Sequence, residues 1–407
     1  LDPSYRVYWE HGFSDIPAGY NQLKDLFESI ESGSSKKLDK YLEEAAYKYK
    51  VGVGKLVYKP GLSFTEFLDW ETIKGVFKLD VFTSIKKHIS NHFKNDKLRR
   101  LMEFPVLFLG ALPRNTPALY SLMNYADIKG GTWYPEGGMY SVVAGMHELA
   151  LELGVTFHFN EKVKAIQTKD NTTKEVVTDK GIYHPEAIIS SADYHFTETE
   201  LLSEKSQSYP SKYWNKRVMA PSCLLYYVGL NKKLQNVLHH SLFFDVPFDQ
   251  HANEIYSAPQ WPSDPLFYVS VNSISDKSVA PAGCDNIVFL IPVAAGLQGD
   301  TEELRKKYFD IILKRMEKHT GQKIADSIVY YKSFSVSDFV HEYNSFRGNA
   351  YGLANTLKQT AILRPSCRSK KVKNLFYTGQ LTVPGPGVPP ALISGEVVAR
   401  EVLKSFQ

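Results

Sequence analysis

The stretch that most constrains this chain lies near its carboxyl end, at residues 373–406. It opens with Leu375–Tyr377, a run that is apolar on both faces and predicts a short buried strand. A loop rich in glycine and proline follows. Pro389 and Pro390 then suit a first helical turn, because proline has a fixed φ and no N–H to satisfy. A strand, a glycine turn and a helix start together direct free backbone N–H groups at a bound anion or electron-rich group.

One glycine is unusual in the helix that this stretch predicts. Gly395 lies in the helix interior, where glycine costs about 1 kcal/mol relative to alanine. This cost indicates that another group approaches the helix backbone there. The geometry alone leaves open an ordinary strand-to-helix connection at the edge of an α/β sheet.

The segment LFYTGQLTVPGPGVPPALISGEVVA resembles the carboxyl-terminal flavin-binding signature of phytoene desaturases, the bacterial and fungal type of carotenoid desaturase. In that family the segment passes the isoalloxazine ring of FAD. The resemblance implies that the FAD contacts include Gly379, Gln380, Pro384, Gly385, Gly387, Val388, Pro389 and Ala391. Members often have Ala-Gly-Thr-His after the first glycine, whereas this chain has Gln380–Val383, which leaves its subgroup and substrate position open.

A second segment, Tyr134–Met139, resembles the family's tyrosine-proline-x-glycine-glycine-methionine run near the flavin ring. The pattern after it predicts a helix over Met139–Leu153 and strands at Val155–Phe159 and Val163–Gln167. In the wider group of FAD amine oxidases, the valine corresponding to Val163 contacts the adenine through its backbone. The resemblance therefore adds Val163 to the implied FAD contacts.

The resemblance covers essentially the whole chain, because residues 347–352 and 363–365 also follow the desaturase pattern. Residues 1–12 resemble a segment that follows the family's amino-terminal dinucleotide-binding βαβ unit. The G-x-G-x-x-G turn of that unit places the pyrophosphate on a helix N-terminus. The near match here, Gly52–Lys55, follows a helical stretch instead of a buried strand. We therefore expect a fragment, or a chain with a disordered part, in which bound FAD is absent or poorly ordered.

The length of 407 residues suits a two-domain α/β (mixed α+β) protein. We expect a discontinuous, incomplete Rossmann-like FAD-binding domain at residues 1–18, 130–198 and 346–407, a substrate-binding domain at 199–345, and a helical substrate-channel and membrane-facing region at 19–129. The FAD-binding domain should include a β meander at Glu175–Thr178, Gly181–Tyr183 and Ala187–Ser191. The substrate domain should have strands at Cys223–Val228, Ser241–Val246, Leu266–Val271, Ile287–Pro292 and Ile328–Phe334, and a helix at Glu302–His319 capped by Asp300.

A basic amphipathic helix is predicted over Val81–Leu101. Its apolar positions are Phe82, Ile85, Ile89 and Phe93, and its basic residues are Lys86, Lys87, Lys94, Lys97, Arg99 and Arg100. Such a helix either lies in an anionic membrane surface or is a solvated helix packed on its own domain. A lipid-soluble substrate favours the membrane.

Composition limits the remaining possibilities. The net charge of +4 is mild and neither requires nor excludes an acidic partner, and we expect no nucleic-acid partner. Cys223, Cys284 and Cys367 have no metal-ligand spacing, are typical of reduced cytosolic thiols, and lead us to expect no metal site. No run approaches the roughly 20 apolar residues of a membrane span, and no signal peptide is visible. We expect a cytoplasmic protein that associates peripherally with membranes; its oligomeric state stays open.

The resemblance implies an FAD-dependent carotenoid desaturase that transfers a hydride from an apolar polyene to the flavin. One alternative is a hydroxycarotenoid 3,4-desaturase, and another is an oxidoreductase related to FAD amine oxidases. A third is a flavin-free fragment that binds substrate and docks on membranes. The catalytic residues stay unassigned. The chemically able side chains are His195, His341, Glu342, Glu136 and Glu396, each of which is also typical of an ordinary surface or hydrogen-bonded polar residue.

Overall fold

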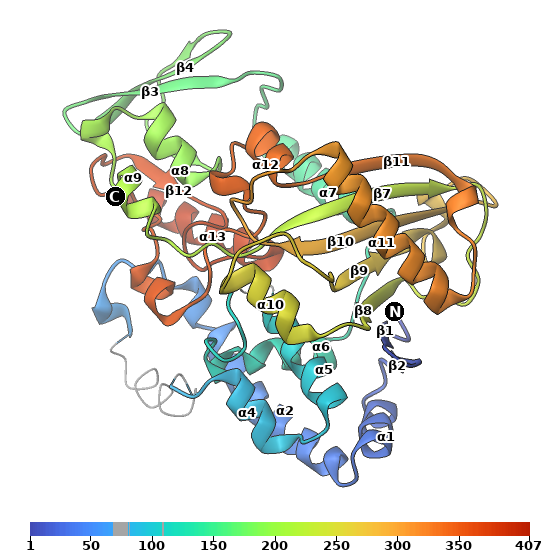
Figure 1. Cartoon of the computed structure of the whole chain (residues 1–407). Coiled ribbons are helices and arrows are strands. Elements are labelled where there is room, and N and C mark those ends of the chain that lie inside the picture. The colour runs from blue at the N-terminus through green and yellow to red at the C-terminus, as the bar shows by residue number, and fades with distance from the viewer. Residues whose placement is uncertain (68–79, 81, 108–109) are drawn as a thin grey trace. The chain divides into compact units, whose positions relative to one another are not determined.

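The computed structural model describes residues 1–67, 80, 82–107 and 110–407 (Figure 1). The chain divides into two compact units. The first comprises Leu1–Leu38, Ala126–Phe157 and Ser222–Ser337, and the second comprises Asp39–Tyr125, His158–Pro221 and Asp338–Gln407. Both units combine helices with β-strands, which confirms the predicted α/β (mixed α+β) class.

A seven-stranded sheet organises the first unit (Figure 1). Its order is β11-β7-β10-β9-β8-β1-β2. β1 runs parallel to β8, and the other neighbouring strands are antiparallel. The bounds are β1 Tyr5–Trp9, β2 Phe13–Ile16, β7 Ser222–Leu230, β8 His240–Phe244, β9 Phe267–Ser270, β10 Asp285–Val293 and β11 Ile328–Phe334. The strands predicted for the substrate domain are therefore all present.

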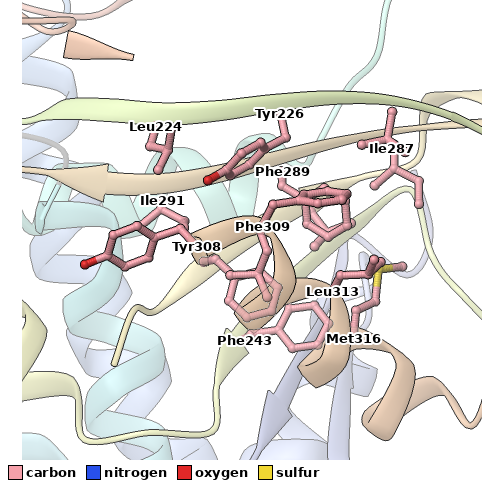
Figure 2. Close-up of a cluster of buried hydrophobic side chains, with 14 of the residues drawn as sticks. Leu224, Tyr226, Phe243, Ile287, Phe289, Ile291, Tyr308, Phe309, Leu313 and Met316 are labelled. Carbon is pink, nitrogen blue, oxygen red and sulfur yellow. The ribbon is translucent and has the colours of Figure 1, made fainter. Parts of the chain in front are cut away.

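The core of the first unit lies between this sheet and helix α11 (Glu302–Thr320). Residues of β10 alternate between buried and half-buried, the period of two that a strand with one covered face requires. Figure 2 shows Phe309, Leu313 and Met316 of α11 directed at the sheet side chains. The sheet contributes Leu224, Tyr226, Phe243, Ile287, Phe289 and Ile291 to this cluster.

The amino-terminal end of α11 differs from the prediction. Thr301 is the cap, and its side chain accepts a hydrogen bond from the backbone N–H of Leu304. Asp300 instead receives two hydrogen bonds from the buried guanidinium of Arg305, at 2.8 and 2.9 Å. A buried arginine requires an anionic partner, and this requirement outweighs capping by Asp300.

The other helices of the first unit are α1 (Tyr20–Ile30), α10 (Phe248–Tyr256) and α7 (Met139–Glu152). α7 confirms the helix predicted after the glycine pair, although none of its residues is buried. Val155–Phe159 forms no strand, so that prediction is wrong. The backbone of this segment pairs with no strand among the described residues, and a strand needs such pairing to satisfy its N–H and C=O groups.

Residues 1–18 also differ from the expected arrangement. All five residues of β1 are buried, and β1 lies between β8 and β2 in the seven-stranded sheet. These residues therefore pair with strands of the seven-stranded sheet, and their unit also holds Ala126–Phe157, which overlaps the expected FAD-binding segment 130–198. A strand that is buried on both faces must pair with neighbouring strands to satisfy its backbone hydrogen bonds. Its local sequence does not specify which strands these are.

The second unit contains a helical part and two small sheets. Its helices are α2 (Ser34–Gly52), α4 (Ile85–His92), α5 (Asp96–Leu107), α6 (Leu122–Gly130), α8 (Tyr194–Phe196), α9 (Ser211–Trp214), α12 (Val336–Tyr343) and α13 (Val388–Ser405), of which α2, α6 and α12 extend across a boundary between units. Short turns of 3-10 helix include Leu56–Tyr58, Ala118–Ser121, Phe346–Gly348 and Ala361–Leu363. Within the described residues, no helix combines the length and the apolar sequence needed to cross a membrane.

The single basic helix predicted over Val81–Leu101 is two helices, α4 and α5, and Val81 itself lies outside the described residues. Asn95 separates them, and its side chain accepts a hydrogen bond from the N–H of Lys97. Ile85, Ile89 and Phe93 are fully buried within the second unit. They cannot enter lipid, so the packed-helix alternative is the correct one for these three residues.

Two sheets complete the second unit. β3 (Val163–Lys169), β4 (Thr172–Thr178) and β5 (Ile182–Tyr183) form an antiparallel meander. β6 (Ile188–Ser190), expected to be part of that meander, instead pairs in parallel with β12 (Leu375–Tyr377). β12 and the start of α13 confirm the strand and helix predicted near the carboxyl end.

Candidate functional site

A cavity of about 440 Å³ lies in the second unit where β6 and β12 end. Ser191–Tyr194 follow β6 and form one wall, and Thr378–Leu381 follow β12 and form the next. The other lining residues are Ala391 of α13, Phe339 and Tyr343 of α12, and Ser345, Asn349 and Ala350 after α12. Ligands of α/β proteins bind where the carboxyl ends of adjacent parallel strands diverge, so this cavity is the candidate site.

The turn after β12 is built around Gly379. Its φ of 103° is in the region that favours glycine, and apart from its chain neighbours no atom of the described part of the chain lies within 4 Å of where a Cβ would be. Its N–H donates to Oγ of Ser394 at 2.8 Å. The same Oγ contacts Oγ1 of Thr378 at 2.6 Å and donates to the carbonyl of Ala391 at 2.6 Å. Ser394 therefore fixes the strand end to the first turns of α13.

Arg364 supports the loop from Gln380 to Thr382 from within the protein. Its guanidinium is 3% exposed and donates to the carbonyls of Thr382 at 3.0 Å and Gln380 at 3.3 Å. It also donates to Oδ1 of Asn355 at 2.6 Å and to the carbonyls of Leu353 and Gln359. Burial lowers its pKa to about 10, so the group stays charged at neutral pH. The loop is thus held by charge-assisted hydrogen bonds.

Two polar residues organise the wall opposite this loop. Asp193 accepts hydrogen bonds from the N–H groups of Phe196 at 3.1 Å and Phe346 at 3.0 Å. Burial raises the pKa of Asp193, and these backbone hydrogen bonds oppose that rise. Oδ1 of Asn349 accepts from the N–H of Gly352 at 2.7 Å and from the side-chain amide of Gln380 at 3.2 Å. Asn349 therefore orients the Gln380 amide at the cavity.

An aromatic pair lies beneath the two strand ends. The rings of Tyr194 and Tyr377 stack with centroids 3.7 Å apart. The Tyr377 hydroxyl donates to Glu198, which also accepts from the N–H groups of Ser208 and Tyr209. Burial raises the pKa of Glu198. This packing joins the two strands rigidly below the cavity.

The structure places the residues implied as FAD contacts in three groups. Gly379, Gln380 and Ala391 line the cavity. Pro384, Gly385, Gly387, Val388 and Pro389 form the loop and the first turn that lead into α13, outside the lining. Val163 is half-buried at the start of β3, in the meander, and is also outside the lining.

The side chains considered able to do acid–base chemistry are all outside the lining. His195 is half-buried and stacks on Phe346 with centroids 4.1 Å apart, and burial lowers its pKa. His341, Glu342 and Glu396 are exposed in the second unit, where Glu396 pairs with Arg400. Glu136 is exposed in the first unit. None of these five gains support from the structure as a catalytic residue.

The residues that sequence analysis missed are those that hold the site. Arg364 and Asn349 lie in segments noted for their family resemblance, but their spacing carries no sign of a shared hydrogen-bond network. Ser394 lies one residue before Gly395 and resembles any small residue of a helix interior. The one signal that sequence analysis contained for Arg364 is the resemblance of residues 363–365 to the desaturase pattern.

The lining residues include no histidine, cysteine or lysine, and the one carboxylate, Asp193, is engaged by backbone N–H groups. A nucleophile with its base is therefore not assembled among these residues. The cavity has the volume of a small-molecule site, about 300–1,000 Å³. The open space at Gly379 and the oriented amide of Gln380 fit a flat heteroaromatic ring with polar edges, as a flavin presents.

The comparisons with known proteins agree with this assignment. Residues 2–403 match the family of flavin containing amine oxidoreductases. A carotenoid 3,4-desaturase of Haloarcula japonica is 36% identical over 408 aligned residues, covering 100% of this chain and 82% of that protein. A zeta-carotene-forming phytoene desaturase of Myxococcus xanthus is 28% identical, covering 99% of this chain and 78% of that protein.

Solved structures share the fold. An oxidoreductase from Methanosarcina mazei gives a TM-score of 0.54 at 14% identity, covering 83% of this chain and 75% of that one. A putrescine oxidase gives a TM-score of 0.53 at 12% identity, and the match covers 92% of this chain and 75% of that one. The family match over nearly the whole chain and the cavity at the ends of β6 and β12 lead to one conclusion: this chain belongs to the flavin containing amine oxidoreductase family.

Proposed function

We propose that this protein is an FAD-dependent carotenoid desaturase, an oxidoreductase that introduces double bonds into an apolar polyene. The observation that carries the proposal is a cavity of about 440 Å³ that is lined by Gly379, Gln380 and Ala391 and whose own residues offer no nucleophile and base pair. The relatives named for carotenoid 3,4-desaturation and phytoene desaturation, which align with essentially the whole chain, specify the substrate class.

The residues that would hold the flavin ring are Gly379, Gln380 and Ala391. Bound FAD would supply the acceptor for the hydride that leaves one carbon of the substrate when a new double bond forms. The protein orients the cofactor through the Gln380 amide, which Asn349 fixes, and through the turn that Arg364 and Ser394 hold. Desaturation releases a proton from the neighbouring carbon, and no lining residue is assigned to accept it.

A 3,4-desaturation of a carotenoid end group is a second candidate. The 36% identical relative is named for that reaction, whereas the 28% identical relative is named for desaturating phytoene. The two reactions use the same hydride and proton removal. They differ in which part of the polyene reaches the flavin.

Pigment production separates these candidates. The protein is expressed in one host that accumulates phytoene and in another that accumulates a hydroxylated carotenoid, and pigments are separated by chromatography. Products with longer conjugation in the first host support phytoene desaturation, and products in the second host alone support 3,4-desaturation. An amine oxidase would instead oxidise amines and produce hydrogen peroxide from dioxygen. A protein with no flavin absorbance and no product in either host would be a binding fragment, which contradicts the proposal.

We also propose that the protein acts at a membrane surface, because carotenoids do not dissolve in water. The side chain of Phe82 is 89% exposed and precedes α4, which carries the exposed Lys87. Each basic residue near an anionic surface contributes about 1 kcal/mol. Liposomes with anionic lipid should bind the protein in a salt-sensitive way, and Phe82→Ser with Lys87→Glu should weaken binding. Lys307→Glu with Lys314→Glu, two exposed positions on α11, is the control that should weaken it less.

A further inference from the structure

Three side chains of the helical part of the second unit converge on one point. His88 and His92 are on α4, and Glu44 is on α2 (Figure 1). Nε2 of His88 lies 3.5 Å from Oε2 of Glu44, and Nε2 of His92 lies 3.9 Å from the same oxygen. One ligand atom from each of the three side chains lies within 4.8 Å of the others.

The two histidines share a face of α4 because residues four apart in a helix lie one above the other. The ring of Tyr41, also on α2, contacts both imidazoles, with centroids 5.2 and 5.3 Å away. The Tyr41 hydroxyl donates to Oδ1 of Asn124 at 2.8 Å, so the ring between the helices is itself fixed. The three ligand groups are therefore held in place by their surroundings.

His88 provides a second, independent observation. Its residue exposure is 7%, and Nε2 has no hydrogen-bond partner among the described residues although it is directed at Glu44. A buried nitrogen without a hydrogen-bond partner is unfavourable, and a cation bound between His88 and Glu44 would supply one.

The separations fit a bound metal ion. Zinc binds imidazole nitrogen and carboxylate oxygen at about 2.0–2.2 Å, so two tetrahedral ligands are about 3.4 Å apart. The Glu44 oxygen lies 3.5 and 3.9 Å from the two Nε2 atoms, which is close to this spacing. Two imidazoles and one carboxylate are a donor set typical of zinc and of related divalent transition metals.

We propose that Glu44, His88 and His92 form a binding site for a divalent transition-metal ion, with Zn²⁺ as the representative ligand. The cation would be bound by three protein groups that leave one position open, and it would join α2 to α4. The carboxylate of Glu44 would balance part of the charge of the cation. The nearby ammonium of Lys48 is buried and pairs with Oδ2 of Asp80 at 2.9 Å. The site is separate from the residues that line the cavity.

The test uses the purified protein with its flavin, treated with a chelator and dialysed. Zn²⁺ is titrated by calorimetry, and Co²⁺ is titrated by visible absorption, which reports nitrogen and oxygen coordination. We expect one equivalent of either metal and a rise in Tm when it binds, because binding to the folded state alone stabilises it. Affinity should fall at least about tenfold in His92→Gln and in Glu44→Gln.

The matched control is His158→Gln. His158 is another histidine beside a carboxylate, with Nδ1 3.6 Å from Glu161, but no third ligand completes that pair among the described residues. This variant should bind metal as the parent does. The proposal is overturned if the parent binds no equivalent of Zn²⁺ or Co²⁺, or if His92→Gln and Glu44→Gln, checked as folded by circular dichroism, bind as tightly as the parent. Flavin content is measured in parallel, so loss of the metal site is distinguished from failure of the proposed desaturase function.

Discussion

The backbone N–H of Gly379 donates a 2.8 Å hydrogen bond to the hydroxyl of Ser394, two turns into the helix that follows. This bond joins the end of β12 to α13 across the loop between them. The cavity wall at Gly379 and Gln380 thus depends on a buried serine that does not line the cavity. The position of the turn is determined by the helix as much as by its glycines.

Removing the Ser394 hydroxyl should therefore weaken both the fold and the site. In Ser394→Ala the N–H of Gly379 loses its acceptor, and a buried unsatisfied donor costs about 1–3 kcal/mol. We expect the free energy of unfolding in urea to fall by that amount and flavin to be retained less well. Ser405→Ala is the control, because Ser405 is an exposed residue of the same helix. Equal losses in the two variants would show that Ser394 has no special role.

Replacing Arg364 by lysine should be more damaging than the unchanged positive charge of the side chain suggests. The guanidinium hydrogen-bonds five groups in different directions, and one ammonium cannot replace it. Arg364→Lys should lower the free energy of unfolding by about 3 kcal/mol, since several buried carbonyls lose their donors. Arg400→Lys, at an exposed surface pair on α13, should cost below about 1 kcal/mol. Chemical denaturation measures the free energy of unfolding of both variants, and their flavin absorbance measures how much cofactor each retains.

Local patterns predicted those elements whose signals are complete within a few residues. β11 and β12 have the predicted bounds, because a run of apolar residues ended by a glycine or polar turn is a local signal. β6 was assigned to the wrong sheet, because its partner β12 is nearly two hundred residues away in the sequence. The helical spacing of the apolar residues Ile85, Ile89 and Phe93 is the same whether protein or lipid covers them. The structure shows that they are buried in the protein.

The site was predicted in part for the same reason. Gly379, Gln380 and Ala391 belong to one contiguous segment, so resemblance located them together. Several hydrogen bonds through which Asn349 and Arg364 act reach residues 9 to 31 positions away, and no spacing rule identifies these partners. The convergence of α2 and α4 at the proposed metal site is a tertiary contact of the same kind.

Asp127 should make the stability of the first unit depend on pH. Its carboxylate accepts from the Tyr5 hydroxyl at 3.3 Å, and burial raises its pKa from 3.8 to about 6. An acid with a raised pKa in the folded state is most favourable to folding below pH 3.8, and this contribution is lost as the pH rises through about 6. At about 1.4 kcal/mol per pH unit, the loss is at most about 3 kcal/mol.

Urea denaturation of the parent and Asp127→Asn at pH 5 and pH 7.5 isolates this effect. Other groups titrate in the same window, but they are shared by both proteins and cancel in the difference. We expect the parent to lose stability relative to Asp127→Asn on going to pH 7.5. A constant difference between the two proteins at both pH values would contradict the assignment.

Gly379 and Gly395 form a matched pair for the last prediction. Apart from the adjoining backbone, an added Cβ would meet no atom of the described residues within 4 Å at either position, so collisions do not distinguish them. The backbone conformation distinguishes the two glycines, because Gly379 has a φ of 103° whereas Gly395 lies inside α13. Gly379→Ala should destabilise by about 1–3 kcal/mol through backbone strain and should reduce flavin binding, since its methyl group enters the cavity wall.

Gly395→Ala should have the opposite sign. Alanine in a helix interior is favoured over glycine by about 1 kcal/mol, so the free energy of unfolding should rise by roughly that amount. Flavin absorbance of the purified variants supplies the second readout. If Gly395→Ala gains stability but loses flavin or turnover, a ligand approaches the helix backbone at this glycine, because no protein atom does. If Gly395→Ala gains stability and keeps its flavin and its turnover, the glycine serves neither cofactor nor substrate. The expectation that another group approaches the helix backbone at Gly395 is then wrong.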